Sequence, residues 1–165
     1  MLFLMSLAYQ FYYFLNDDIM NNPVSSVVGE DWYVKDTTWE STIAHELGHY
    51  ISFTAFLRQN GLSNITFVTA DNEAKINDAM SRFDSGEFSM SILNQALSNY
   101  NSKYNTNLDV NSFALTISKY AGAKDKNGNL IADETIAEAI HDYYLHGYSC
   151  SKSSYEIVSI IKSKL

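Results

Sequence analysis

The sequence predicts an α+β domain, with short strands in its first half and helices from the middle of the chain onward. Three short runs have the apolar, aromatic or β-branched composition of strands, at residues 11–15, 32–34 and 65–68. Later stretches instead repeat their apolar residues every three or four positions, which is typical of helices. The chain has 165 residues, of which 46% are hydrophobic, enough for one domain with its own core. We therefore expect residues 1–165 to form a single domain, with residues 1–36 as its strand and loop region.

The composition excludes several kinds of partner. The formal net charge is −8 and the sequence contains no basic stripe, which argues against a nucleic-acid-binding surface. Residues 1–15 are strongly apolar, but they lack the basic start and the cleavage site of an export signal, and they are too short for a membrane span. We therefore expect neither a signal peptide nor a membrane span. The single cysteine, Cys150, excludes an internal disulfide.

The first long helix is predicted over residues 37–60. Thr37 and Glu40 have the spacing of a capping box at its start, and Gly61 stands where a left-handed residue ends many helices. Gly48 lies inside this helix, where glycine costs about 1 kcal/mol relative to alanine. We therefore expect another segment, or a substrate, to approach the helix closely at Gly48. The apolar residues that recur at four-residue steps are expected to face the core: Trp39, Ile43, Leu47, Ile51 and Ala55.

The same helix carries the pattern His-Glu-x-x-His at residues 45–49. Two histidines four residues apart project from one face of a helix, at the separation that two ligands of one zinc ion require. Glu46 lies about a third of a turn away, where it can take a proton from a water molecule held by the metal. Such a short pattern also occurs by chance on surface helices. Here the helix has cap signals at both ends and acidic residues follow downstream, so we interpret His45 and His49 as metal ligands and Glu46 as a general base.

Polar breaks divide the rest of the chain into further helices. Asp71 has the position of a helix cap, and the turn at residues 84–86 would end the helix that it opens. The other expected helices span residues 88–100, 110–120 and 133–146, and a last one begins at a capping box formed by Ser153 and Glu156.

Residues 125–129 read Asp-Lys-Asn-Gly-Asn, and alternating oxygen donors of this kind occur in calcium-binding loops. Leu130 stands where a calcium loop needs glycine, however, and Ile136 stands where it needs glutamate. Asn-Gly is also a strong signal for a tight turn. We therefore expect a turn here and no calcium site.

A catalytic zinc ion needs a third protein ligand, and the helix predicted after Asp133 offers candidates. Glu134, Glu138 and Asp142 lie at four-residue steps, with His141 among them. Such a row can be a solvated helix face whose first acids favour the helix dipole, which accounts for Glu134 but not for the whole row. Facing two histidines, the row would supply one ligand and further carboxylates that orient the imidazole rings. His141 is interpreted as a packed core histidine.

The motifs His-Glu-Leu-Gly-His and Glu-Thr-Ile-Ala-Glu-Ala together resemble the gluzincin metallopeptidases, in particular the lethal-factor-type zincins, which include the Pro-Pro endopeptidases. Similar domains occur in proteins of bacterial phages and mobile elements. The resemblance covers residues 31–151 through sparse motifs. It implies a zincin-like fold, with a small sheet beside the active-site helix and a mainly helical second half. It also implies one zinc ion per chain, held by His45, His49 and Glu134, with Tyr120 facing the metal.

The resemblance leaves two registers open for the third ligand. In the lethal-factor register Glu134 is the ligand, because Tyr120 precedes it and Ala-Glu-Ala follows it. The helix also resembles the ligand helix of thermolysin, in which Glu138 would bind the metal and Asp142 would support it. Both registers satisfy the four-residue spacing. We favour Glu134, with Glu138 and Asp142 as supporting acids.

The resemblance implies hydrolysis of peptide bonds in a peptide or protein substrate. Zinc would polarise the carbonyl and activate a water molecule, Glu46 would act as general base, and Tyr120 would donate to the oxyanion. An extended substrate would pair with the edge of the sheet that precedes the helix. Without a recognisable signal peptide, the expected location is the bacterial cytoplasm, unless the protein is delivered by another route. The alternative is a non-catalytic zincin-fold binding or structural protein of a phage or mobile element; the intact Glu46 counts against it, because structural zinc needs no general base.

Overall fold

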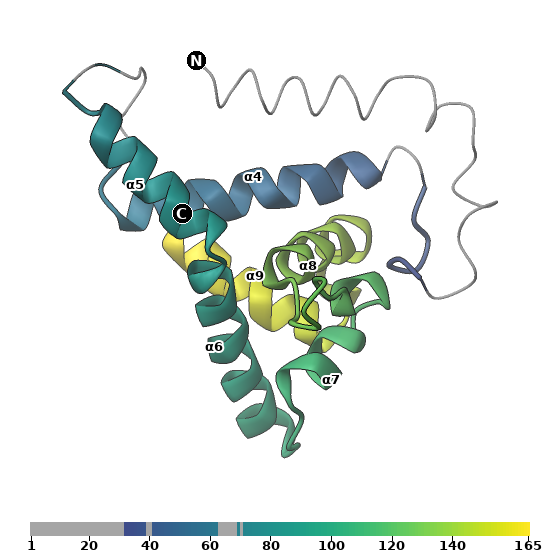
Figure 1. Cartoon of the computed structure of the whole chain (residues 1–165). Coiled ribbons are helices and arrows are strands. Elements are labelled where there is room, and N and C mark those ends of the chain that lie inside the picture. The colour runs from purple at the N-terminus through teal and green to yellow at the C-terminus, as the bar shows by residue number, and fades with distance from the viewer. Residues whose placement is uncertain (1–31, 39–40, 63–68, 70) are drawn as a thin grey trace.

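The computed structural model describes residues 32–38, 41–62, 69 and 71–165, and helices account for almost all of their regular structure (Figure 1). None of the described helices is both long and apolar enough to cross a membrane. In chain order, the elements are α4 (Thr42–Gln59), α5 (Glu73–Asp84), α6 (Glu87–Tyr104), α7 (Val110–Leu115), the 3-10 turn η1 (Tyr120–Gly122), α8 (Ala132–His146), the 3-10 turn η2 (Gly147–Ser149) and α9 (Lys152–Lys164).

The expected α+β fold is wrong, because the described part of the chain contains no sheet. Its isolated β-bridge joins Lys124 to Leu130 across the turn between them. The strands expected at residues 11–15 and 65–68 lie outside the described residues. The proposed pairing of a substrate with a sheet edge therefore has no basis in the described structure.

Residues 32–34 form bends where a short strand was expected. Their backbone groups find partners outside any sheet. The Tyr120 N–H donates to the Trp32 carbonyl over 2.8 Å, and the Val34 N–H donates to the Glu138 carboxylate over 3.3 Å. Because a side chain and a 3-10 turn take up these groups, the segment crosses α8 and η1 without forming a ladder.

Helix α8 is the element around which the other helices pack. It contacts α4, α6, α9 and η1, and Figure 1 shows it directly below α4 in the view. The largest side chains of the core come from most of the helices, so one core serves the whole described domain. They include Phe53, Phe56, Ile92, Leu93, Phe113, Ile136, Ile157 and Ile161.

Several helix ends differ from the prediction. Helix α4 begins only at Thr42, because Thr38 and Ser41 exchange hydrogen bonds between their side chains and backbone N–H groups ahead of it. The expected helix start at residue 37 is therefore wrong, and Glu40 of the expected capping box lies outside the described residues, as does Trp39. Gly61 does have the expected left-handed conformation just after it, with φ of 69°. The predicted caps Asp71 and Asp133 are wrong, because Asn72 precedes α5 and Ile131 precedes α8. Three further ends differ: α6 continues to Tyr104, α7 ends at Leu115, and α9 is capped by Ser151 and not by Ser153.

The buried face of α4 matches the predicted one only in part. Ala55 is buried and Ile51 packs against the core, as predicted, but Leu47 is 45% exposed. The other buried residues of the helix are small residues and two phenylalanines besides His45: Ala44, Gly48, Ser52, Phe53 and Phe56. A Cβ atom added at Gly48 would lie 2.8 Å from the Cα of Ala137. Close approach of α8 therefore explains the glycine, as the sequence led us to expect, and it also sets which face of α4 is buried.

Gly48→Ala should destabilise the protein although alanine is the better helix former. The new methyl group would meet the backbone of α8, which can give way only by moving a helix. Overpacking costs about 1–3 kcal/mol and the gain in helix propensity is about 1 kcal/mol, so we expect a net loss of up to about 2 kcal/mol in the free energy of unfolding, measured by chemical denaturation. Gln59→Ala, at an exposed position of the same helix, is the control and should change stability little. Equal or greater stability of Gly48→Ala would contradict the close packing.

Candidate metal centre

Two packed helices bring three ligand atoms together. Helix α4 presents His45 and His49 one turn apart, and their Nε2 atoms lie 3.2 Å from each other. From the first turn of α8, Glu134 places its Oε2 atom 3.1 Å from the Nε2 of His45 and 3.7 Å from that of His49. These three residues are called the Nε2 group below.

The Nε2 group has the dimensions of a tetrahedral metal site. Ligand atoms that lie about 2.0–2.2 Å from a small metal ion in tetrahedral geometry lie about 3.3–3.6 Å from one another. The three separations of the Nε2 group, 3.1, 3.2 and 3.7 Å, bracket that range. An ion can therefore bind between these atoms with little movement of the side chains.

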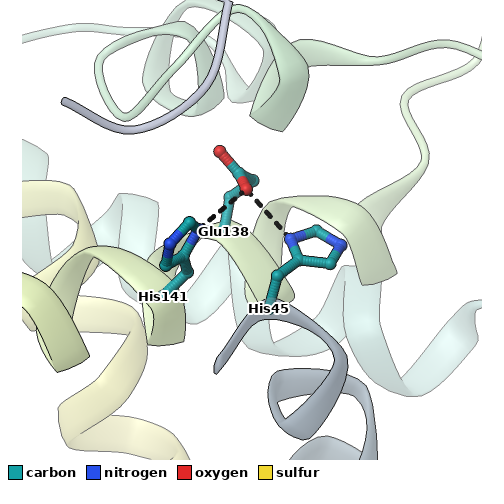
Figure 2. Close-up of side chains that lie close together, drawn as sticks. All are labelled: His45, Glu138 and His141. Atoms are coloured by element: carbon teal, nitrogen blue, oxygen red, sulfur yellow. Dashed lines mark hydrogen bonds and ion pairs between the residues drawn. The ribbon is translucent and has the colours of Figure 1, made fainter. Parts of the chain in front are cut away.

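A second group of potential ligands shares His45 but uses its other ring nitrogen. Figure 2 shows Glu138 between His45 and His141, with its Oε1 atom 2.9 Å from the Nδ1 of His45 and 3.4 Å from the Nδ1 of His141. All three residues are buried. They too are close enough to hold a metal ion.

The Glu138 carboxylate is already saturated with hydrogen bonds. Its Oε2 atom accepts from the Ser118 hydroxyl over 2.7 Å and from the Val34 N–H over 3.3 Å, while its Oε1 atom faces the two histidines. The residue is completely buried. A metal ion here would have to displace bonds that stabilise a buried charge, whereas the Nε2 group is partly accessible.

Each histidine of the Nε2 group is held from behind by a carboxylate. The Nδ1 atom of His45 faces Glu138, and the Nδ1 atom of His49 lies 2.8 Å from Asp133. If Nδ1 carries the hydrogen, both rings turn an unprotonated Nε2 toward the metal position, as histidine ligands in metalloproteins commonly do. Asp133 was expected only as a helix cap. It is not one of the acids at four-residue steps, and for this reason the spacing did not predict that it would contact His49.

In the absence of metal, the cluster favours charged imidazoles. Burial lowers the pKa of His45, but hydrogen bonds with Glu134 and Glu138 outweigh it and raise the pKa to about 9. Burial likewise lowers the pKa of His49, and Asp133 and Glu134 raise it to about 10. Burial raises the pKa of Glu138, but hydrogen bonds from His141 and His45 bring it down to about 2. The pKa of Glu134 also falls well below its usual range, because its bonds to His45 and His49 outweigh burial.

Of the two other predicted site residues, Tyr120 has a direct contact with the Nε2 group. The ring of Tyr120 is 5.6 Å from that of His45. Burial and the negative charge of Glu134 hold the pKa of Tyr120 far above its usual range, so its hydroxyl stays protonated. Glu46 is half-buried on α4, one residue after His45, and none of the hydrogen bonds or ion pairs found among the described residues involves its carboxylate.

Asp142 lies apart from the Nε2 group. Its carboxylate accepts from the Ser151 N–H over 2.9 Å and lies 2.7 Å from the Nδ1 of His146, near the end of α8. His141 turns its Nε2 to the Ser41 hydroxyl, 2.9 Å away. The residues that sequence reasoning did not single out are Asp133 as a partner of His49, Ser118, and Tyr33, whose ring lies 5.2 Å from that of Tyr120.

The loop at residues 125–129 is a turn, as predicted. One oxygen of Asp125 accepts from the N–H groups of Asn127 and Asn129, and the other from the Asn129 side chain. Gly128 has a positive φ of 85°. The carboxylate that a calcium ion would need is thus used to close the turn.

Comparison with known proteins found no match to this chain. No protein-family model, no curated protein and no solved structure matches the chain. The interpretation of the site therefore depends on its own geometry and on its motifs.

The histidine pKa values predict opposite effects of pH with and without metal. A histidine whose pKa is raised on folding stabilises the protein fully below its ordinary pKa of about 6.5, and that stabilisation is lost as pH rises toward its folded value. The metal-free protein should therefore lose stability as pH rises from about 6.5 toward 9–10, the folded pKa values of His45 and His49. Zinc must displace these protons, so the increase in melting temperature that it causes should grow with pH. Thermal melts in zinc and in chelator, at about pH 6 and about pH 8, would measure this; a zinc effect independent of pH would contradict it.

Proposed function

We propose that this chain is a zinc-dependent peptidase of the gluzincin kind, with one zinc ion held by His45, His49 and Glu134. The observation that carries the proposal is the convergence of the two Nε2 atoms and one Glu134 oxygen at separations suited to one tetrahedral ion. Three protein ligands on two helices leave a fourth position for water or substrate, which is the arrangement of catalytic zinc sites.

Glu134 is favoured over Glu138 as the third ligand. Glu138 faces the Nδ1 of His45, while Glu134 faces the Nε2 atoms that converge with it. Glu138 also accepts hydrogen bonds from Ser118 and Val34, which suits a residue that fixes a histidine ring. Asp142, the supporting acid of the alternative register, contacts His146 and Ser151 instead. The packing of α8 thus supports Glu134 as ligand and Glu138 as the residue that orients His45.

The chemistry proposed for the site divides between a zinc ion and two residues of this chain. Zinc, when bound, would supply a Lewis acid that polarises the substrate carbonyl and makes water more acidic. Glu46 lies next to His45 on α4 with its carboxylate uncommitted, so it can accept the proton from water and deliver it to the leaving amine. Tyr120 keeps its hydroxyl hydrogen, so it can donate to the oxygen on which negative charge develops.

Zinc content should separate the two groups of potential ligands. Purified protein should contain one zinc ion per chain, and His49→Ala and Glu134→Ala should abolish its retention because each removes a ligand. Glu138→Ala should weaken zinc affinity by roughly 10–100-fold, as for residues that orient a ligand. His141→Ala should retain zinc, as should His146→Ala, a control histidine outside the Nε2 group. Elemental analysis and zinc titration would measure this.

Two results would contradict this assignment. Loss of zinc in His141→Ala with retention in His49→Ala would place the ion in the buried group around Glu138. Absence of stoichiometric metal from unmutated protein, produced with zinc available, would refute the metal site itself.

The peptidase activity itself is tested at Glu46. Glu46→Gln keeps the size of the side chain but cannot accept a proton at neutral pH, so cleavage of a peptide library should fall by at least ~10²-fold while zinc content and melting temperature are retained. Tyr120→Phe should cost about 10²-fold, also without loss of zinc. Glu73→Gln, on the exposed surface of α5, is the matched control. Equal cleavage by Glu46→Gln and unmutated protein would refute the mechanism, and absence of cleavage by both would favour the non-catalytic binding protein.

A further inference from the structure

Tyr33 is a second tyrosine beside the candidate metal centre, and the chemistry proposed above gives it no role. Its ring centroid lies 5.2 Å from that of Tyr120, whose own ring lies 5.6 Å from that of His45. Tyr33 therefore contacts the ring that itself contacts the ligand His45. Tyr33 is neither fully buried nor fully exposed. Its position is that of a residue at the edge of a site.

The backbone on both sides of Tyr33 is attached to the site. Trp32 accepts a hydrogen bond from the Tyr120 N–H over 2.8 Å, and Val34 donates one to Glu138 over 3.3 Å. Further along the segment, Asp36 lies 3.3 Å from the Nε2 of His146 at the end of α8. Because its neighbours are fixed to η1 and α8, Tyr33 is held in place before any substrate binds. Such preorganisation reduces the entropy lost on binding.

The Tyr33 hydroxyl is suited to donate a hydrogen bond. Burial, followed by the negative charges of Glu138 and Glu134, raises its pKa above the ordinary value. The group therefore keeps its hydrogen at neutral pH. A peptide offers backbone carbonyls as acceptors, so a protonated tyrosine at the edge of a peptidase site matches its substrate chemically.

We infer that Tyr33 contacts the peptide substrate, donating its hydroxyl hydrogen to a backbone carbonyl beside the bond that is cleaved. The inference rests on the proposed function. The Tyr120 ring contacts His45 and the Tyr33 ring contacts Tyr120, so we assign Tyr120 to the reacting carbonyl and Tyr33 to one farther along the peptide. The 5.2 Å between the two rings is more than the rise of about 3.3 Å per residue of an extended peptide, which places that carbonyl one or two residues away. The site should thus prefer longer peptides to dipeptides.

The test measures peptide binding separately from cleavage. In the Glu46→Gln background, extended peptides from a library are titrated against zinc-loaded protein with and without Tyr33→Phe, and cleavage of the same peptides by unmutated protein is measured separately. Loss of one hydrogen bond should raise the Kd by about 3- to 10-fold, with zinc content and melting temperature unchanged. In the active protein, Tyr33→Phe should raise KM similarly and leave kcat nearly unchanged, whereas Tyr120→Phe should lower kcat. Tyr144→Phe, at a position of α8 that is 69% exposed, is the matched control.

Peptides shortened by one residue from either end locate the contact. Removing the peptide residue that carries the bound carbonyl should weaken binding to protein that keeps Tyr33. In Tyr33→Phe the same truncation should weaken binding little further, because the hydrogen bond is already absent. An unchanged Kd and KM in Tyr33→Phe, or a fall in kcat alone, would overturn the inference while leaving the peptidase in place. Binding without cleavage, still weakened by Tyr33→Phe, would support the contact and refute the peptidase. Absence of binding by any peptide would refute both.

Discussion

The close contact between α4 and α8 at Gly48 is the constraint on which the rest of the site depends. A side chain at this position would collide with the Ala137 backbone, so only glycine lets the helices approach to this distance. The histidines lie one turn apart on one helix, and the acids that meet them lie on the first turns of the other. A helix moved outward by the width of a methyl group would separate Glu134 from the Nε2 atoms by more than a metal ion can bridge. Glycine lowers the stability of α4 relative to alanine, but it allows a site to form between the two helices.

Glu138 connects this interface to the rest of the fold. A buried carboxylate is stable only when it is paired and hydrogen-bonded, and here its partners come from different parts of the chain. They are Val34 ahead of α4, His45 on α4, Ser118 before η1, and His141 on α8 itself. The same bonds that satisfy the charge therefore fix the ring of His45 and hold residues 32–38 over the site. Where the expected fold would use a sheet beside the active-site helix, the described part of this chain uses a polar network.

The sequence was informative where the signal was local. Three features could be predicted from neighbouring residues, and the structure has all three: the spacing of His45 and His49, the left-handed Gly61 after α4, and the close approach of a second helix at Gly48. The prediction of an α+β fold was wrong, because a short apolar run does not show which segment its backbone will pair with. Residues 32–34 form hydrogen bonds with Glu138 and Tyr120. The core face of α4 was assigned to large apolar residues, although small residues face α8. Asp133 and Tyr33 come to the site through packing between distant segments, which spacing along one helix does not reveal.

The charges of the site explain how one packing arrangement can serve with and without a metal ion. Asp133, Glu134 and Glu138 bring three carboxylates to two imidazoles. Without metal, the raised pKa values of His45 and His49 place two positive charges among these acids. A divalent ion would bring the same two positive charges when those two protons leave. The net charge of the cluster is therefore the same in both states, because two positive charges face the same three carboxylates in each. Because the Nδ1 contacts to Glu138 and Asp133 need not change, metal uptake would require loss of protons from Nε2 but no rearrangement of α4 against α8.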